Sequence, residues 1–209
     1  MNYKKIKKQN IKFFSNTLRN SSDEHHSVAQ SEISHLKRFE KILELGKFNN
    51  KRILDVGCGI GGFYGFLRQQ DIHTDYTGID INEHMIKTAK RKYPELKNSF
   101  FVHDIIEKKM NETFDYVVSV GPLNLKFEGF SNNNITMRLI KKMYKMANIG
   151  IAISMTSSLT KRPNKKTFYY DPVKILSKTF KFCKNVKFDH TYIPHDFVLF
   201  CYKKDLYDF

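Results

Sequence analysis

A glycine-rich turn flanked by carboxylates is the part of this chain whose residue types and spacing most clearly indicate chemistry. The apolar stretch Arg52–Val56 carries Asp55 and runs directly into Gly57-Cys58-Gly59-Ile60-Gly61. Glycines at such positions let the backbone turn sharply and approach a ligand closely, because no Cβ stands in the way. A helix that begins there also points the free N–H groups of its first turn at the ligand. The pattern predicts a loop that binds a nucleotide-type cofactor.

The glycine spacing alone does not decide which cofactor binds. Gly57, Gly59 and Gly62 fit the G-x-G-x-x-G dinucleotide fingerprint, and the loop also fits a looser Asp-x-Gly-x-Gly-x-Gly pattern. Asp55 would repel a pyrophosphate, but it suits a cationic ligand such as S-adenosylmethionine (SAM), which has a sulfonium and no phosphate. Asp80 ends a second apolar stretch 23 residues after Gly57. A carboxylate there can accept both ribose hydroxyls, which suits NAD and SAM equally.

Four motifs in this order resemble those of the class I (Rossmann-like) SAM-dependent methyltransferases. Leu54–Gly61 (LDVGCGIG) resembles their first motif and Gly78–Asn82 (GIDIN) the second. His103-Asp104-Ile105 resembles the third, and Phe114–Ser119 (FDYVVS) the fourth. The resemblance covers residues 51–120 and implies a Rossmann-like fold, SAM as the cofactor and methyl transfer as the activity.

The resemblance also implies which residues hold the cofactor, at the carboxyl ends of the strands. Gly57 and Gly59 would line the methionine moiety and Asp80 would bind the ribose. Asp104 would accept a hydrogen bond from the adenine amino group while the N–H of Ile105 meets a ring nitrogen. The complete set of expected cofactor-binding residues is Asp55, Gly57, Cys58, Gly59, Gly61, Asp80, Ile81, Asp104, Ile105, Ser119 and Arg38.

The acceptor side is less defined. Ser119–Asn124 (SVGPLN) lacks the Asn/Asp-Pro-Pro-aromatic tetrad of adenine-methylating enzymes, and the chain has no Pro-Cys pair and no visible metal site. We expect three stretches to cover the opening: the N-terminal helix with the link at residues 23–26, the loop after the fourth strand, and Tyr169–Asp171. We also expect deletion of residues 1–20 to spare SAM affinity but remove turnover. The candidate catalytic residues are Tyr170, His195 and His26.

The C-terminal third refines the expected function. Phe168–Pro172 (FYYDP) and His195-Asp196-Phe197 resemble a subset of bacterial class I methyltransferases, most of whose acceptors are undefined. We therefore expect methyl transfer to an O or N atom of a small molecule, of an anionic, glycan or natural-product type. The alternatives are an RNA methyltransferase and a non-catalytic SAM- or nucleotide-binding module, since a fold alone does not separate these classes.

Composition constrains partners and location. The 209 residues carry a formal net charge of +15, which suggests a polyanionic partner such as RNA. Only seven of the 36 basic residues are Arg, however, and the abundance of Lys, Asn, Ile, Phe and Tyr is what an AT-rich genome encodes. Three cysteines without paired spacing indicate a reduced, cytoplasmic protein. No secretory signal and no apolar run of about 20 residues is visible, so we expect no membrane insertion.

The elements that position these residues alternate between strand and helix, which predicts an α/β, doubly wound, mostly parallel seven-stranded sheet ending in an antiparallel hairpin. We expect an N-terminal helical cap over residues 1–48 and a methyltransferase domain over 49–209, together forming one domain. Predicted strands lie near residues 51–56, 75–80, 99–103, 114–120, 149–155, 185–189 and 197–202. Predicted helices lie near residues 3–19, 31–45, 61–70, 82–92, 133–147 and 172–180.

Overall fold

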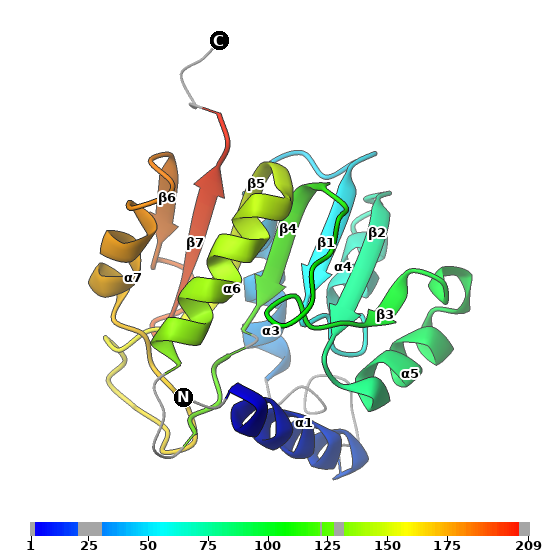
Figure 1. The fold of residues 1–209 in the computed structure, drawn as a ribbon, viewed down its shortest axis with the longest axis horizontal. Helices are drawn as coiled ribbons and strands as arrows, with labels where there is room; N and C mark the ends of the chain where they lie inside the picture. Colours follow the sequence, from blue (N-terminus) through cyan, green and yellow to red (C-terminus); the bar gives the residue numbers. More distant parts are fainter. Residues whose placement is uncertain (1–2, 21–30, 122, 128–131, 205–209) are drawn as a thin grey trace.

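The computed structural model describes residues 3–20, 31–121, 123–127 and 132–204. Its centre is a seven-stranded sheet in the order β3-β2-β1-β4-β5-β7-β6 (Figure 1). The strands are β1 (Arg52–Val56), β2 (Asp75–Asp80), β3 (Phe100–Val102), β4 (Phe114–Val120), β5 (Ala147–Thr156), β6 (Val186–Asp189) and β7 (Asp196–Tyr202). Only β7 runs against its neighbours, pairing antiparallel with both β5 and β6. The predicted doubly wound sheet with a C-terminal hairpin is therefore confirmed.

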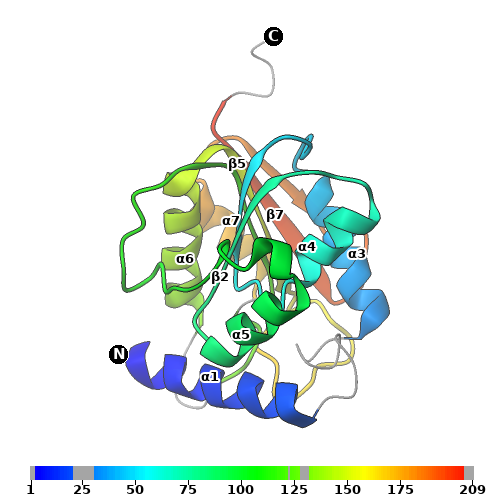
Figure 2. The ribbon, with the colours of Figure 1, turned by 90° about the vertical axis from the view of Figure 1, so that its right-hand side faces the viewer.

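Helices cover both faces of this sheet (Figure 2). Apolar residues of α3, α4 and α5 pack in one core, and those of α6 and α7 pack in a second core on the opposite face. The helices are α1 (Tyr3–Asn20), α3 (Glu32–Leu43), α4 (Gly62–Gln69), α5 (Glu83–Lys92), α6 (Asn133–Met146) and α7 (Pro172–Thr179). Strands covered on both faces carry long apolar runs, as in Val117-Val118 of β4 and residues 197–202 of β7, which is buried along its whole length.

The strand order reverses between β1 and β4. From β1 the chain builds outward through β2 to β3, and then returns to add β4 and β5 on the other side. Such a reversal leaves a crevice at the carboxyl ends of the two central strands, where ligands bind in open α/β sheets.

Helix α1 lies across this end of the sheet rather than against either face (Figures 1 and 2). Its sequence alternates apolar residues with lysines, and it is fixed at two points. Tyr3 and Lys7 bind Asp104 after β3, and Ser15 exchanges hydrogen bonds with Asn82 at the start of α5. Within the described residues, no helix is long and apolar enough to cross a membrane.

Candidate active site

The glycine loop joins β1 to α4 and adopts a conformation that favours glycine. Gly57, Gly59 and Gly61 have φ angles of 77°, 55° and 84°, in the left-handed region that residues with a Cβ rarely adopt. Gly57 and Gly59 line a cavity at the carboxyl ends of the strands. Gly61 instead lies against Tyr93, whose ring would be 2.8 Å from an added Cβ. The first two glycines therefore shape the cavity, and the third allows close packing beneath it.

Asp80, at the end of β2, holds the loop in place. Its Oδ2 accepts the N–H of Gly59 at 3.1 Å and its Oδ1 accepts the N–H of Asn82 at 2.8 Å. Burial raises the pKa of Asp80 to about 6, although hydrogen bonds from these N–H groups oppose the shift. Because a carboxylate has about four lone-pair directions, both oxygens can accept further hydrogen bonds from a ligand in the cavity.

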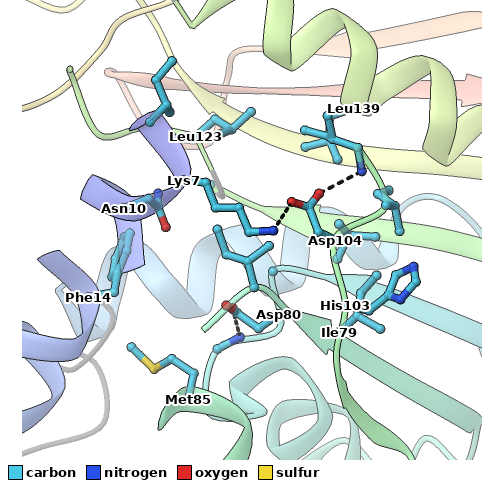
Figure 3. Close-up of a pocket in the computed structure, with 18 of the residues that line it drawn as sticks. Lys7, Asn10, Phe14, Ile79, Asp80, Met85, His103, Asp104, Leu123 and Leu139 are labelled. Carbon is cyan, nitrogen blue, oxygen red and sulfur yellow. Dashed lines mark hydrogen bonds and ion pairs between the residues drawn. The ribbon is translucent and has the colours of Figure 1, made fainter. Parts of the chain in front are cut away.

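The cavity, which we call the inner cavity, encloses about 920 Å³ of empty space, open solvent included. Its walls are mainly apolar, with a few polar groups around them (Figure 3). It is lined by Tyr3, Ile6, Lys7, Asn10, Phe14, Val56, Gly57, Gly59, Ile79, Asp80, Ile81, Met85, His103, Asp104, Ile105, Ile106, Val120, Gly121, Leu123 and Leu139. His103 Nε2 is buried there without a hydrogen-bond partner among the described residues.

Asp104, the predicted partner of an adenine amino group, already has partners from α1. Its Oδ2 lies 2.8 Å from Lys7 Nζ and accepts the Tyr3 hydroxyl at 3.0 Å (Figure 3). Its Oδ1 accepts the N–H of Ile106 at 2.9 Å. Burial alone would raise the pKa of Asp104, but the hydrogen bond and charge of Lys7 outweigh burial and hold it below its ordinary value. An adenine amino group would have to share this carboxylate with α1.

Six of the predicted cofactor-binding residues line the inner cavity: Gly57, Gly59, Asp80, Ile81, Asp104 and Ile105. Asp55 lies behind the wall, where its Oδ2 accepts the Tyr76 hydroxyl at 2.7 Å, and burial raises its pKa to about 7. Ser119 also lies behind it, donating to the carbonyl of Val56 at 2.6 Å. Cys58 is buried and, like Gly61, lies outside the cavity lining.

Arg38 does not lie in the inner cavity either. Its Nε donates to Asp196 Oδ2 at 2.8 Å, and both side chains are buried. Burial raises the pKa of Asp196, while the charge of Arg38 opposes the rise. Arg38 thus links α3 to β7.

A second cavity, the outer cavity, adjoins the first and shares Phe14 and Gly121 with it. It encloses about 1,380 Å³ of empty space, open solvent included. It is lined by Phe13, Phe14, Ser31, Ser34, Arg38, Gly121, Asn124, Leu125, Thr156, Arg162, Asn164, Lys166, Thr167, Tyr169 and His195. Most of these residues come from α1, the loop after β4 and residues 162–169, and the others from α3, β5 and the turn before β7. Each of the three stretches predicted to cover the opening contributes, the third only through Tyr169.

The predicted catalytic candidates fall in different places. His195 lines the outer cavity, and burial together with the charge of Arg38 lowers its pKa. Tyr170 is buried in the core, where its hydroxyl donates to the carbonyl of Leu123 at 2.7 Å and lies 2.9 Å from Thr136 Oγ1. Its neighbour Tyr169 lines the cavity instead. His26 and the rest of the 23–26 link lie outside the described residues.

The sequence did not indicate which residues α1 contributes to the inner cavity. The amphipathic pattern of α1 can be recognised in the sequence, but the sequence does not show which groups its polar side chains contact. Within the described part of the chain, no three His, Cys, Asp or Glu side chains are grouped as a metal site requires.

Comparisons with known proteins show which family this chain resembles. Residues 47–207 match a family model described as a methyltransferase domain. A protein of Invertebrate iridescent virus 6 that is named as a methyltransferase, 235L, is 27% identical over 146 residues, covering 68% of this chain and 53% of that protein. The chain thus spans about half the length of that curated relative, and less of the next ones.

Two solved structures share the fold. The N-methyltransferase NodS from Bradyrhizobium japonicum WM9, in complex with S-adenosylhomocysteine, superposes with a TM-score of 0.67 at 16% identity, covering 92% of this chain and 97% of that chain. The phosphoethanolamine N-methyltransferase 1 of Haemonchus contortus, in complex with phosphoethanolamine and S-adenosylhomocysteine, gives 0.70 at 17% identity, covering all of this chain and 51% of that chain.

The sheet order and the crevice beside the glycine loop define a class I, Rossmann-like nucleotide-binding fold. The chain belongs to the methyltransferase-domain family, whose model matches more than three quarters of its length. The predicted methyltransferase family is therefore confirmed, and the predicted fold is shared with a structure that holds S-adenosylhomocysteine.

Proposed function

We propose that this protein transfers the methyl group of SAM to an O or N atom of a small-molecule acceptor. The inner cavity would hold SAM and the outer cavity the acceptor. One observation carries this assignment: the two cavities meet at Phe14 and Gly121, beside the glycine loop. A donor in one cavity and an acceptor in the other would come together at that junction.

The residues of the inner cavity suit SAM. Asp80 has lone pairs available for the two ribose hydroxyls, and Gly57 and Gly59 leave room for the methionine part. Apolar side chains such as Ile81 and Ile105 would enclose the adenine ring, with the unpartnered His103 Nε2 nearby. Since SAM carries a sulfonium, the acids of this region favour it over a pyrophosphate-bearing dinucleotide.

The protein's part in the reaction is mainly to align the reactants. When bound, SAM supplies an electrophilic methyl group. A lone pair on the acceptor forms the new bond to the methyl carbon, while the C–S bond breaks and its electron pair stays on sulfur, leaving S-adenosylhomocysteine. Holding the three atoms in line lowers the barrier by proximity and orientation. His195, whose lowered pKa favours the neutral ring at pH 7, is the candidate to accept the proton that an acceptor hydroxyl or ammonium loses.

We also propose that the protein acts in the cytoplasm as one domain, with residues 1–48 forming a cap on residues 49–209. All three cysteines are free and buried, which suits a reducing compartment. Phe39 and Ile42 of α3 pack into the core of the sheet, and α1 binds Asp104. These contacts favour a cap that is part of the domain rather than a separate unit.

The test is a transfer assay with methyl-labelled SAM against separate metabolite and RNA fractions, in 50 and 200 mM salt. We expect label in a small-molecule product and none with Asp80→Ala. Association with RNA through phosphates alone should collapse between these salt concentrations without sequence preference. Sequence-selective labelling of RNA at the higher salt would favour the RNA methyltransferase. SAM binding without label in either fraction would favour the non-catalytic module.

A further inference from the structure

We propose that the acceptor carries an oxyanion, a phosphate or carboxylate group, which Arg162 and Lys166 bind at the outer end of the outer cavity. The atom that receives the methyl group would lie at the other end of the same small molecule, beside Phe14 and Gly121. This inference rests on the proposed function and adds the chemical class of the acceptor.

The charges of the outer cavity are the first observation. Arg162, Lys166 and Arg38 line it, and none of the lining residues that the structure describes is acidic. Arg38 is paired with Asp196, so its charge is largely compensated. Neither the Arg162 guanidinium nor the Lys166 ammonium forms a hydrogen bond or ion pair with the part of the chain that the structure describes. Two uncompensated cations at one cavity attract an anionic ligand.

The segment that carries these cations is held in a defined shape. The N–H of Lys166 donates to Asn164 Oδ1 at 2.8 Å, and its carbonyl accepts the N–H of Lys126 at 2.8 Å. Phe168 likewise donates its N–H to the carbonyl of Asn124 at 2.8 Å. The segment is therefore fastened to the loop after β4, which forms the opposite wall. Because the backbone of this segment is already ordered, an anion that binds there need not order a free loop, which lowers the entropy cost of binding.

Tyr169 adds a neutral donor. Its hydroxyl oxygen accepts the N–H of Asn164 at 2.8 Å, and its own hydrogen is donated to no described residue. An oxyanion placed between Arg162 and Lys166 can accept this hydrogen. Hydrogen bonds between ionised and neutral partners of this kind are stronger than those between neutral groups.

The part of the outer cavity that adjoins the inner cavity is apolar. Phe14 and Gly121 line both cavities, and the ring of Phe13 lies against that of Phe14. Arg162 and Lys166 line only the outer cavity, so its cations lie away from this apolar junction with the donor site. A ligand with an anionic group at one end and an O or N atom beyond an apolar stretch matches both parts.

The experiment uses the full chain saturated with S-adenosylhomocysteine and three probes: phenyl phosphate, benzoate and benzyl alcohol. Binding is followed by calorimetry, or by NMR shifts if it is weak. The variants are Arg162→Ala, Lys166→Ala and Tyr169→Phe. The matched controls are Lys161→Ala and Lys165→Ala, which remove exposed cations from the same segment that do not line the cavity.

We expect phenyl phosphate, benzoate or both to bind more tightly than benzyl alcohol, and their ratio distinguishes phosphate from carboxylate. Arg162→Ala and Lys166→Ala should each weaken the favoured anion about tenfold, as expected for a lost hydrogen bond to a charged group. Tyr169→Phe should weaken it about threefold, and the controls less than about twofold.

The inference is overturned, and the proposed function stands, if S-adenosylhomocysteine binds while benzyl alcohol binds as tightly as the anions. It is also overturned if the control variants lose as much affinity as Arg162→Ala, because the effect would then be one of general charge. Displacement of phenyl phosphate by a short RNA at micromolar concentration overturns it in favour of a nucleic acid. Failure of the wild-type protein to bind S-adenosylhomocysteine overturns the proposed function and this inference with it.

Discussion

The inner and outer cavities adjoin, yet they differ in charge and in how the chain builds them. Asp80 and Asp104 line the inner cavity, with Asp55 buried behind it, whereas Arg162 and Lys166 line the outer one, whose described lining residues include no acid. The inner cavity draws Asp80, His103 and Asp104 from the ends of two neighbouring strands, and Tyr3, Lys7 and Asn10 from α1. The outer cavity draws its walls from segments at both ends of the chain. The first arrangement suits a cationic cofactor and the second an anionic acceptor.

This difference explains why one cavity is encoded by local motifs and the other is not. A strand, a tight turn and a helix place Asp80 and the glycine loop together within about 25 residues of sequence. The outer cavity depends on contacts such as Arg38 with Asp196, which are 158 positions apart. The residues that line the outer cavity can therefore vary while those of the inner cavity stay the same.

The largest expected effect tests whether the outer wall is anchored in the core. Tyr170→Ala should lower the free energy of unfolding by about 3–5 kcal/mol, because it empties a fully buried aromatic site. Tyr170→Phe should cost about 0.5–1.5 kcal/mol, since it removes one of two hydrogen bonds to the Leu123 carbonyl, which still accepts Asn132 Nδ2 at 2.7 Å. Denaturant unfolding measures both. The matched control is the neighbouring Tyr169→Ala. An equal loss of unfolding free energy in Tyr169→Ala and Tyr170→Ala would contradict the burial of Tyr170, rather than Tyr169, in the core.

Asp55 and Asp80, the buried acids beside the inner cavity, should make the free energy of unfolding depend on pH, and their pKa shifts define the sign. Burial raises the pKa of Asp55 from 3.8 to about 7 in the folded protein. Folding therefore takes up a proton between these values, and the contribution of Asp55 is present below pH 4 and lost as the pH rises through 7. Asp55→Asn keeps an acceptor for Tyr76 but no charge, so at pH 8 it should be more stable by up to about 4 kcal/mol.

Unfolding free energies measured from pH 4 to pH 8 check this expectation. Asp80, with a pKa raised to about 6, has a folded-state shift of the same sign, so a shallower slope should persist in Asp55→Asn. Asp75→Asn, at the exposed start of β2, is the control. A variant whose pH profile matches that of the wild type would show that Asp55 is not the buried charge described above.

The smallest effect concerns α1, which lines both cavities. Lys7→Met keeps the apolar stem but removes the ammonium that binds Asp104 and Glu107. We expect a loss of about 1 kcal/mol in the free energy of unfolding, because the Tyr3 hydroxyl still binds Asp104. Lys8→Met, one position along on the exposed side, should cost nothing measurable. Equal effects of the two variants would mean that the ion pair does not hold α1 in place.

The same helix changes an expectation drawn from the sequence. Deletion of residues 1–20 was expected to spare SAM affinity. Because Tyr3, Lys7 and Phe14 line the inner cavity, we now expect the deletion to weaken SAM binding as well as turnover.

Much of the fold was predictable because its signals are local. The bounds of β2 and β4 are those predicted, and the other elements differ by about two residues at most. Of the residues predicted to bind the cofactor, some line the inner cavity and others do not. Val56 and Val120 line the inner cavity, whereas Asp55 and Ser119, one residue earlier, lie behind it. Successive side chains of a strand point to opposite faces, so a motif can locate a strand end without showing which residue faces the ligand.

The remaining features could not be predicted because they depend on distant pairing. Nothing near Tyr3 or Lys7 in the sequence indicates that Asp104, about 100 positions away, is their partner. Nor does the sequence distinguish Tyr169, which lines the outer cavity, from Tyr170, which is buried in the core.

Titration calorimetry with S-adenosylhomocysteine and NAD tests most directly whether the acid-flanked glycine loop forms a SAM site. We predict one S-adenosylhomocysteine per chain and far weaker binding of NAD. Asp80→Ala should weaken S-adenosylhomocysteine by about 1.5–3 kcal/mol, the scale of hydrogen bonds to a charged group, while the surface variant Asp75→Ala changes it by less than about 0.5 kcal/mol. Tight NAD binding, or an Asp80→Ala variant that binds S-adenosylhomocysteine as well as the wild type, would contradict the assignment.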